Sequence, residues 1–133
     1  MTALAPAGVA PPVPPYSLVT VAGDVVAVAG QMPIDATGAP VAGAFAEQAA
    51  QVIRNLELCL AAAGCTLSDV FKVNAYIADL ANLDEFNELF RQRFPTPPPA
   101  RTTVRCDLIG DHTMIELDAL ALRPRAAATE AAR

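Results

Sequence analysis

The sequence has a single histidine, His112, and it contains no HExxH motif, no phosphate-cradling glycine loop and no serine elbow. A metal site needs several converging ligands, so one imidazole argues against a metal centre and against histidine-dependent nucleophilic catalysis. His112 follows Asp111 in a turn, and we interpret it as a solvated loop residue. We therefore expect no metal and no cofactor, and chemistry that depends on carboxylates, arginines, tyrosines and the backbone.

Charge is also scarce, and it is mostly negative. Charged residues make up 17% of the chain, the formal net charge is −5 and the pI is about 4.6. This balance opposes binding to nucleic acid or to an anionic membrane surface. No run of about 20 apolar residues could span a bilayer, and no positive residue precedes an apolar stretch at the N-terminus. The three cysteines form no CxxC motif, which is typical of reduced thiols and predicts a cytoplasmic protein.

Apolar residues reach 53% of the 133 positions, which is high for one domain of this size. A domain of this size buries only about two thirds of its unfolded surface, so some apolar side chains must be buried elsewhere, usually at a subunit interface. Alanine inflates the count, which leaves a monomer as the alternative, but we favour an oligomer. Residues 1–14 are expected to form an extended Ala/Pro-rich arm, residues 15–124 a single domain, and residues 125–133 a fraying tail.

Hydrophobic periodicity predicts five strands and two helices in the order ββαβαββ. The predicted strands cover 18–22, 25–29, 70–78, 101–106 and 113–122, and the helices cover 44–63 and 82–94. Gly23-Asp24 is a hairpin signal between the first two strands, and Phe71 is assigned to the apolar face of the third. Right-handed crossovers would put both helices on one face of a single mixed sheet, an α+β fold. The other face would stay bare and would need a partner.

Polar side chains concentrate on the last two predicted strands. If these strands pair as a hairpin with a turn near Gly110, Thr103 lies opposite Glu116 and Arg101 lies near Asp118. Such a group is either a functional site or an edge hairpin with weak cross-strand ion pairs, and the pattern alone leaves both open. The apolar residues around the two carboxylates favour the functional interpretation, because buried charge is unfavourable without a partner or a purpose.

Five short motifs resemble those of the YjgF/RidA family, in the same order and spacing from about residue 15 to 122. They are Pro15-Tyr16, Ala29–Pro33, Phe86-Asn87, Pro99–Val104 and Ile115–Ala119. The resemblance implies a chorismate-mutase-like fold and a homotrimer with clefts between its subunits. It also implies hydrolysis of small carboxylated enamines or imines, such as 2-aminoacrylate, to 2-keto acids and ammonia. Pathway-specific deaminases of 2-aminomuconate or aminoacrylate, ribonucleases and a non-catalytic trimer that binds small carboxylates are the alternatives, and the acidic composition disfavours a ribonuclease.

The resemblance also implies residue roles. Arg101 would hold the substrate carboxylate through two parallel hydrogen bonds, and Glu116, with a pKa raised by burial, would activate water and shuttle protons. Tyr16 would close the cleft from a neighbouring subunit, and Gly30 and Asn87 would line the pocket. From the residues alone, Tyr16 could equally cap the first strand, Gly30 could be a turn residue, and Asn87 could face solvent.

Two positions depart from the family pattern. Thr103 stands where cysteine is common, and Ala29 where serine is frequent. Thr103 keeps a hydroxyl that can contact substrate, and deamination of this kind needs no thiolate. Cys106 lies three positions later on the opposite strand face, so we interpret it as a structural thiol. These departures leave the subfamily, and with it the substrate, open.

Overall fold

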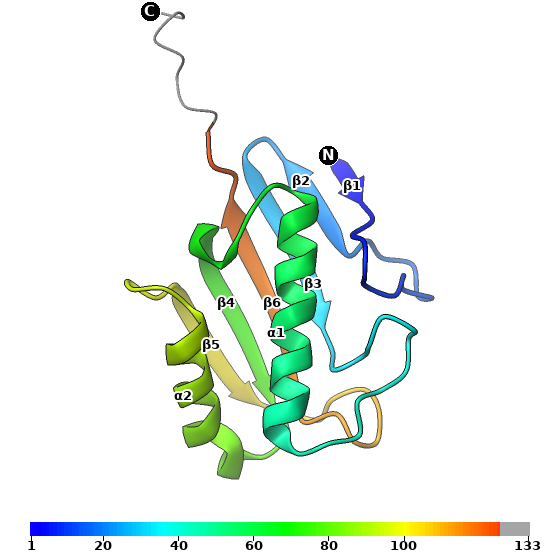
Figure 1. The fold of residues 1–133 in the computed structure, drawn as a ribbon, viewed down its shortest axis with the longest axis vertical. Coiled ribbons are helices and arrows are strands. Elements are labelled where there is room, and N and C mark those ends of the chain that lie inside the picture. Colours follow the sequence, from blue (N-terminus) through cyan, green and yellow to red (C-terminus); the bar gives the residue numbers. More distant parts are fainter. Residues whose placement is uncertain (126–133) are drawn as a thin grey trace, which may run out of the picture.

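The computed structural model describes residues 1–125, whose path Figure 1 shows; the tail predicted to fray lies, from residue 126 on, outside the described residues. Within them, one six-stranded sheet and two α-helices form the fold. The strands are β1 (Thr2–Leu4), β2 (Val19–Ala22), β3 (Val25–Gln31), β4 (Val70–Ile77), β5 (Ala100–Arg105) and β6 (Ile115–Leu122), and the helices are α1 (Phe45–Ala62) and α2 (Leu83–Arg93). Single 3₁₀ turns at Leu67–Asp69 and Leu80–Asn82 precede β4 and α2.

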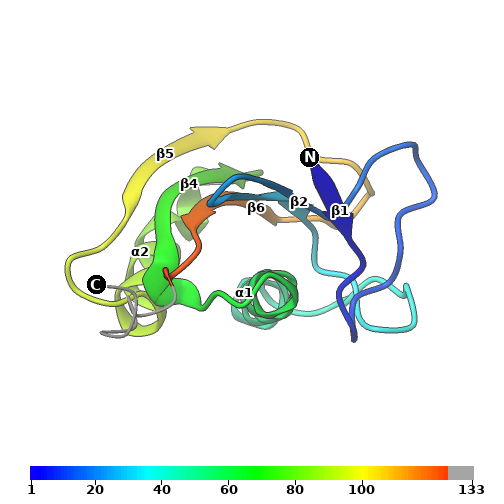
Figure 2. The same cartoon turned by 90° about the horizontal axis from the view of Figure 1, so that it is seen from above.

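The strands lie in the order β1-β2-β3-β6-β4-β5. Only β4 and β5 pair in parallel; all other neighbours are antiparallel. Both helices pack on the same face of the sheet, as Figure 2 shows from above. The predicted α+β fold, with one mixed sheet and two helices on one face, is therefore confirmed. The strand β1, for which the sequence analysis assigned no element, adds to the outer edge of β2.

The core lies between this sheet face and the helices. The apolar stripe of α1 is buried along its length, from Phe45 to Cys59, against β3 and β6. The helix ends as expected at Gly64, whose positive φ of 75° lets the chain turn back. Phe86 and Phe90 of α2 and Phe94 just after it are buried in the same core.

The predicted hairpin between the last two strands is wrong. β6 lies in the middle of the sheet between β3 and β4, whereas β5 is an edge strand beside β4. In β6, Ile115, Leu117, Ala119 and Ala121 are buried, and the residues between them face the other side of the sheet. The central position of β6 lets α1 cover this buried apolar row. The α2 crossover then carries the chain to a parallel pairing of β5 on the free edge of β4.

Phe71 is a second correction. Its side chain is 46% exposed, whereas Val70 is buried in its place. The pairing of β4 with β6 shifts register between Val70 and Lys72. This irregularity reverses the alternation at the start of the strand, and strict alternation from the sequence could not reveal it.

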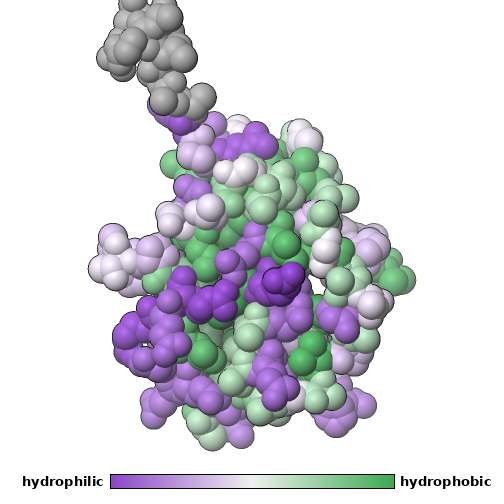
Figure 3. Space-filling model, viewed as in Figure 1, coloured by the Kyte–Doolittle hydropathy of each residue, from purple (hydrophilic) through white to green (hydrophobic). Residues whose placement is uncertain are grey.

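The two outer faces differ in character. Hydrophilic side chains gather over the helices in the view of Figure 3. The face of the sheet without helices exposes apolar side chains at Val25, Val104, Leu120 and Leu122. Among residues 1–125, no helix is long and apolar enough to cross a membrane.

Candidate active site

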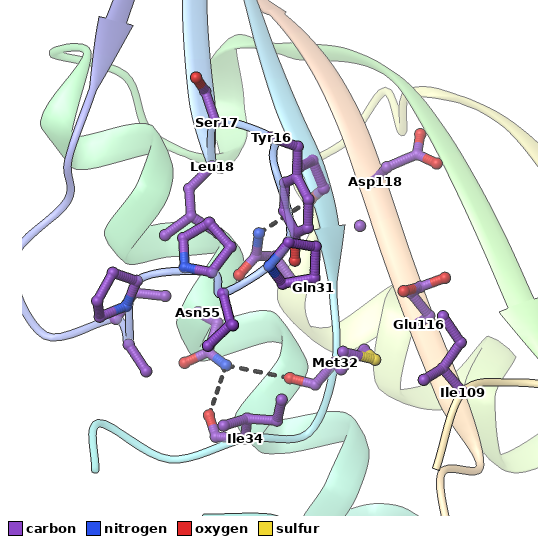
Figure 4. Close-up of a pocket in the computed structure, with 18 of the residues that line it drawn as sticks. Tyr16, Ser17, Leu18, Gln31, Met32, Ile34, Asn55, Ile109, Glu116 and Asp118 are labelled. Carbon is purple, nitrogen blue, oxygen red and sulfur yellow. Dashed lines mark hydrogen bonds between the residues drawn. The ribbon is translucent and has the colours of Figure 1, made fainter. Parts of the chain in front are cut away.

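A groove of about 680 Å³ opens beside the end of β3, and it contains the first half of the predicted site. Gly30 from β3 lines it, together with Tyr16 from the segment before β2 and Glu116 from β6. Figure 4 shows Tyr16 and Glu116 in this groove. Asp118 and Tyr76 also line it, on the helix-free face of the sheet. Tyr16 is 45% exposed and lies in the groove of its own chain.

Glu116 lies directly against the backbone of Gly30. A Cβ built on Gly30 would be 2.9 Å from both the Glu116 carboxyl carbon and its Oε1. The backbone φ of Gly30 is not positive, so its backbone conformation does not require glycine. Position 30 requires glycine because the Glu116 carboxyl approaches so closely. Burial raises the pKa of the Glu116 carboxyl above its ordinary value, and the charge of Asp118 raises it further.

Asp118 is held by two donors from β4. Asn74 Nδ2 donates to Asp118 Oδ1 over 2.9 Å, and the Tyr76 hydroxyl donates to Asp118 Oδ2 over 2.8 Å. The bond to Asp118, followed by burial, raises the pKa of Tyr76 to about 12. The predicted contact between Asp118 and Arg101 is therefore wrong, since β4 supplies the partners of this carboxylate.

Buried amides fix the loops around the groove. Asn55 of α1 donates to the carbonyls of Met32 and Ile34 over 3.2 and 2.8 Å, which holds the turn after β3. Gln48 donates to the His112 carbonyl over 2.7 Å and accepts from the Met114 amide over 2.8 Å, which holds the chain before β6. Both amides are almost fully buried, so they keep the groove's frame rigid. In residues 1–125, no three His, Cys, Asp or Glu side chains gather as metal ligands would.

The second half of the predicted site is a hollow of about 530 Å³ between α2 and β5. Arg101 Nη2 donates to Asn87 Oδ1 over 2.6 Å. The guanidinium carbon lies 4.9 Å from the Phe86 ring centre and 4.8 Å from that of Phe90. These contacts orient a planar cation, and burial lowers the pKa of the guanidinium. Within residues 1–125, Arg101 takes part in no ion pair.

One chain does not bring the two halves together. Arg101 and Thr103 lie in register with Val73 and Ala75, whose buried side chains face the helices. Glu116 alternates with buried residues of β6 and faces the other way. Tyr16, Gly30 and Glu116 thus share one face, whereas Asn87, Arg101 and Thr103 share the opposite one. We name these two sets the acidic half-site and the basic half-site.

Sequence reasoning missed Asn74 and Tyr76. Both alternate with the buried residues of β4, so period-2 geometry alone places them on the helix-free face. Their contact with Asp118 depends on β4 being the neighbour of β6, which the incorrect hairpin concealed. The arm residues that wall the groove were also missed, among them Val9 and Val13.

A family model described as endoribonuclease L-PSP, the YjgF/RidA family, matches residues 7–123. The chain belongs to this family. A RutC family protein of Pyrococcus horikoshii is 37% identical over 113 residues, which are 84% of this chain and 90% of that protein. The human 2-iminobutanoate/2-iminopropanoate deaminase is 31% identical over 123 residues, which are 92% and 87% of the two chains.

Solved structures of YjgF/RidA proteins share the fold. The crystal structure of RidA from the Antarctic bacterium Psychrobacter superposes with a TM-score of 0.86 at 28% identity. The match covers 92% of this chain and 98% of the Psychrobacter chain. Because the family model spans residues 7–123, β3, β6, α2 and β5, which form the groove and the hollow, all lie within the matched YjgF/RidA domain.

Proposed function

We propose that this protein hydrolyses small carboxylated enamines and imines to 2-keto acids and ammonia, in a site formed between copies of the chain. The observation that carries the proposal is the complementarity of the two half-sites. One face offers an oriented guanidinium without an ion-pair partner among residues 1–125, and the other offers a carboxyl group that burial makes ready to exchange protons. The likeness to the human deaminase supports the same reaction.

The chemistry needs two recognition steps and one proton carrier. The Arg101 fork would bind the substrate carboxylate by two parallel bonds, with Asn87 holding the fork in plane. An enamine gains a proton at its β-carbon and becomes an imine. Water, activated by Glu116, then adds to the imine carbon, and the carbon–nitrogen bond breaks as ammonia leaves with a proton. The balance is one imine and one water to one keto acid and one ammonia.

The assembly follows from the positions of the half-sites. Because they lie on opposite faces, an acidic half-site can meet a basic one only on a second copy. Repetition of such a head-to-tail contact forms a closed ring when the rotation between copies adds up to a full turn. We propose a homotrimer, in which the exposed apolar residues of the helix-free face are covered at the contacts. Relative to Arg101, Tyr16 then comes from the other copy. A protein that sediments as a monomer at working concentration would contradict this assembly.

Mixing two inactive variants tests the shared site. Arg101→Ala and Glu116→Gln homomers are each expected to be inactive, because every site lacks one group. When equal amounts are unfolded and refolded together, about a quarter of the sites combine both intact groups if assembly is random. We therefore expect keto-acid release at about a quarter of the wild-type rate. A chain carrying both substitutions, mixed with itself, is the matched control and should stay inactive.

Recovery in the mixture would identify sites formed between copies, whereas no recovery from two well-assembled variants would contradict the proposal. Saturable binding of a small carboxylate without turnover by the wild type would instead indicate a non-catalytic trimer. The groove volume of about 680 Å³ falls in the range of pockets for drug-sized ligands, which favours a larger aminated acid as a second candidate substrate. Rates for imines of increasing size would decide between the two.

RNA is a poor fit to the same groove. Its charged lining consists of Glu116 and Asp118, which would repel phosphate, and the whole chain carries a net charge of −5. We propose that the protein works in the reducing cytoplasm, where its three free cysteines stay reduced.

Replacing Gly30 by alanine should impair the reaction without unfolding the protein. The new Cβ would push the Glu116 carboxyl out of position, and a small misplacement of a reacting group lowers the rate by roughly 10-fold or more. Gly64→Ala is the contrasting control, because its positive φ makes it lower the stability by about 1 kcal/mol while leaving the groove intact. Steady-state rates and thermal unfolding of both variants check this. Equal rates for Gly30→Ala and wild type would contradict it.

A further inference from the structure

The groove at the acidic half-site is lined by two carboxylates, Glu116 and Asp118, with different surroundings. Asp118 accepts hydrogen bonds from Asn74 and Tyr76, one on each oxygen. Among the described residues, no hydrogen bond supports the Glu116 carboxylate, which is buried against Gly30. One carboxylate is therefore fixed by donors, and the other is free to gain or lose a proton. Pairs of acids in such unequal surroundings are how proteins divide acid and anion roles.

The register between β4 and β6 explains how this arrangement arises. Tyr76 lies directly opposite Glu116, and Asn74 lies opposite Asp118. The Tyr76 hydroxyl nevertheless reaches diagonally to Asp118, so its proton does not serve the glutamate that it faces. Side chains two positions apart on one strand face are roughly 7 Å apart, close enough for a fixed charge to act on a neighbour in a half-buried site.

We propose that Asp118, fixed by Asn74 and Tyr76, is a positioning residue for Glu116: its held negative charge makes the neighbouring carboxyl keep its proton longer, and so sets the pH range in which Glu116 can exchange protons with a substrate. The inference rests on the proposed function for the use of that proton, but not for the coupling between the two carboxyl groups. Burial and the Asp118 charge act on the Glu116 pKa in the same direction.

The other groups that face Glu116 leave this role to Asp118. Tyr76 approaches from β4, and its raised pKa of about 12 keeps this phenol neutral near pH 7. Tyr16 approaches from the segment before β2 and adds no carboxylate. Cys106 makes the smallest electrostatic contribution to the raised pKa of Tyr76. In the proposed assembly, Arg101 of another copy enters from outside and would be neutralised by the substrate's own carboxylate. Asp118 is thus the one negative neighbour built into the same chain's groove among the described residues.

The test is a titration of Glu116 in the whole assembled protein, followed by carbon NMR of labelled glutamate carboxyl groups. The Glu116 signal is identified by its loss in Glu116→Gln. We expect Asp118→Asn, which keeps the shape and removes the charge, to move the midpoint down by about 0.5–1 pH unit. Asp24 lies in the β2–β3 turn, next to the end of β6 that is far from Glu116, so Asp24→Asn removes the same charge and should leave the midpoint unchanged.

Tyr76→Phe gives a change of opposite sign. It leaves the Asp118 charge in place but removes one of its two donors, so the charge should act more strongly and move the Glu116 midpoint upward. The pH–rate profiles of the same variants should move with the titrations. A midpoint in Asp118→Asn equal to that in Asp24→Asn overturns the inference; should that variant fail to assemble, an unmoved midpoint in Tyr76→Phe overturns it instead. A shifted midpoint in a protein that turns over no imine would keep the coupling and refute the proposed function.

Discussion

Arg101→Ala is expected to lower kcat/KM for a carboxylated imine by about 10²- to 10⁴-fold, the value of two lost hydrogen bonds between charged groups. The loss should be this large because the guanidinium is already oriented, by Asn87 on one side and by the rings of Phe86 and Phe90. Among the residues that line this hollow, the one other cation is Arg91, and it pairs with Glu88.

Arg101→Lys is the more demanding variant of the same experiment. Lysine keeps the charge, but it cannot make two parallel bonds or stack on the two rings, so its rate should stay much closer to that of alanine than to wild type. Arg91→Ala removes an exposed cation at the rim of the same hollow and is the matched control, with little change expected. The readout is keto-acid release from freshly generated imine, with the assembly of each variant checked by light scattering. Equal rates for Arg101→Ala, wild type and buffer would contradict the proposed activity.

Local patterns in the sequence predicted the elements well but could not predict their order in the sheet. The Gly23-Asp24 turn and the stripe of α1 involve neighbours in the sequence, so period and turn chemistry were sufficient. Whether β6 pairs with β5 or enters between β3 and β4 depends on contacts between distant residues. The sequence did not predict β1, because its three residues have no strong alternating pattern. They form a strand only where the edge of β2 is open for pairing.

The site was predictable to the extent that its residue types carry their own chemistry. Glu116 in an apolar strand and a glycine at position 30 were both singled out, and the structure brings them into contact. The prediction that failed was the hairpin that placed Thr103 opposite Glu116 and Arg101 near Asp118. These residues are on opposite faces because parallel pairing with β4 turns Arg101 toward α2, and no local pattern encodes that choice.

Glu116→Gln is expected to remove the proposed activity and to stabilise the protein at neutral pH. The amide cannot carry a proton between water and the departing amine, so the rate should fall by about 10²- to 10⁴-fold. Stability should move the other way, because burial raises the folded-state pKa of this carboxyl. Below the ordinary pKa of glutamate, both states hold the proton and the variant gains nothing. As pH rises through the raised folded-state pKa of Glu116, the free energy of unfolding of the wild type falls, because the buried carboxyl must ionise. The variant cannot ionise, so its free energy of unfolding does not fall in this range.

Thermal unfolding at a series of pH values measures this gain, which we expect to grow between the two pKa values and to level off at about 1 kcal/mol above them. Glu85→Gln, an exposed change on α2, should show no such growth. The expected loss of activity and the expected gain in stability support one interpretation. A carboxylate that is retained although it destabilises the fold has a functional role, and the role proposed for Glu116 is proton transfer. A Glu116→Gln protein that is less stable than wild type at pH 8 would mean that the charge is paired in the assembly, most simply with the guanidinium of another copy, and Glu116 would then hold the subunits together instead of acting on substrate.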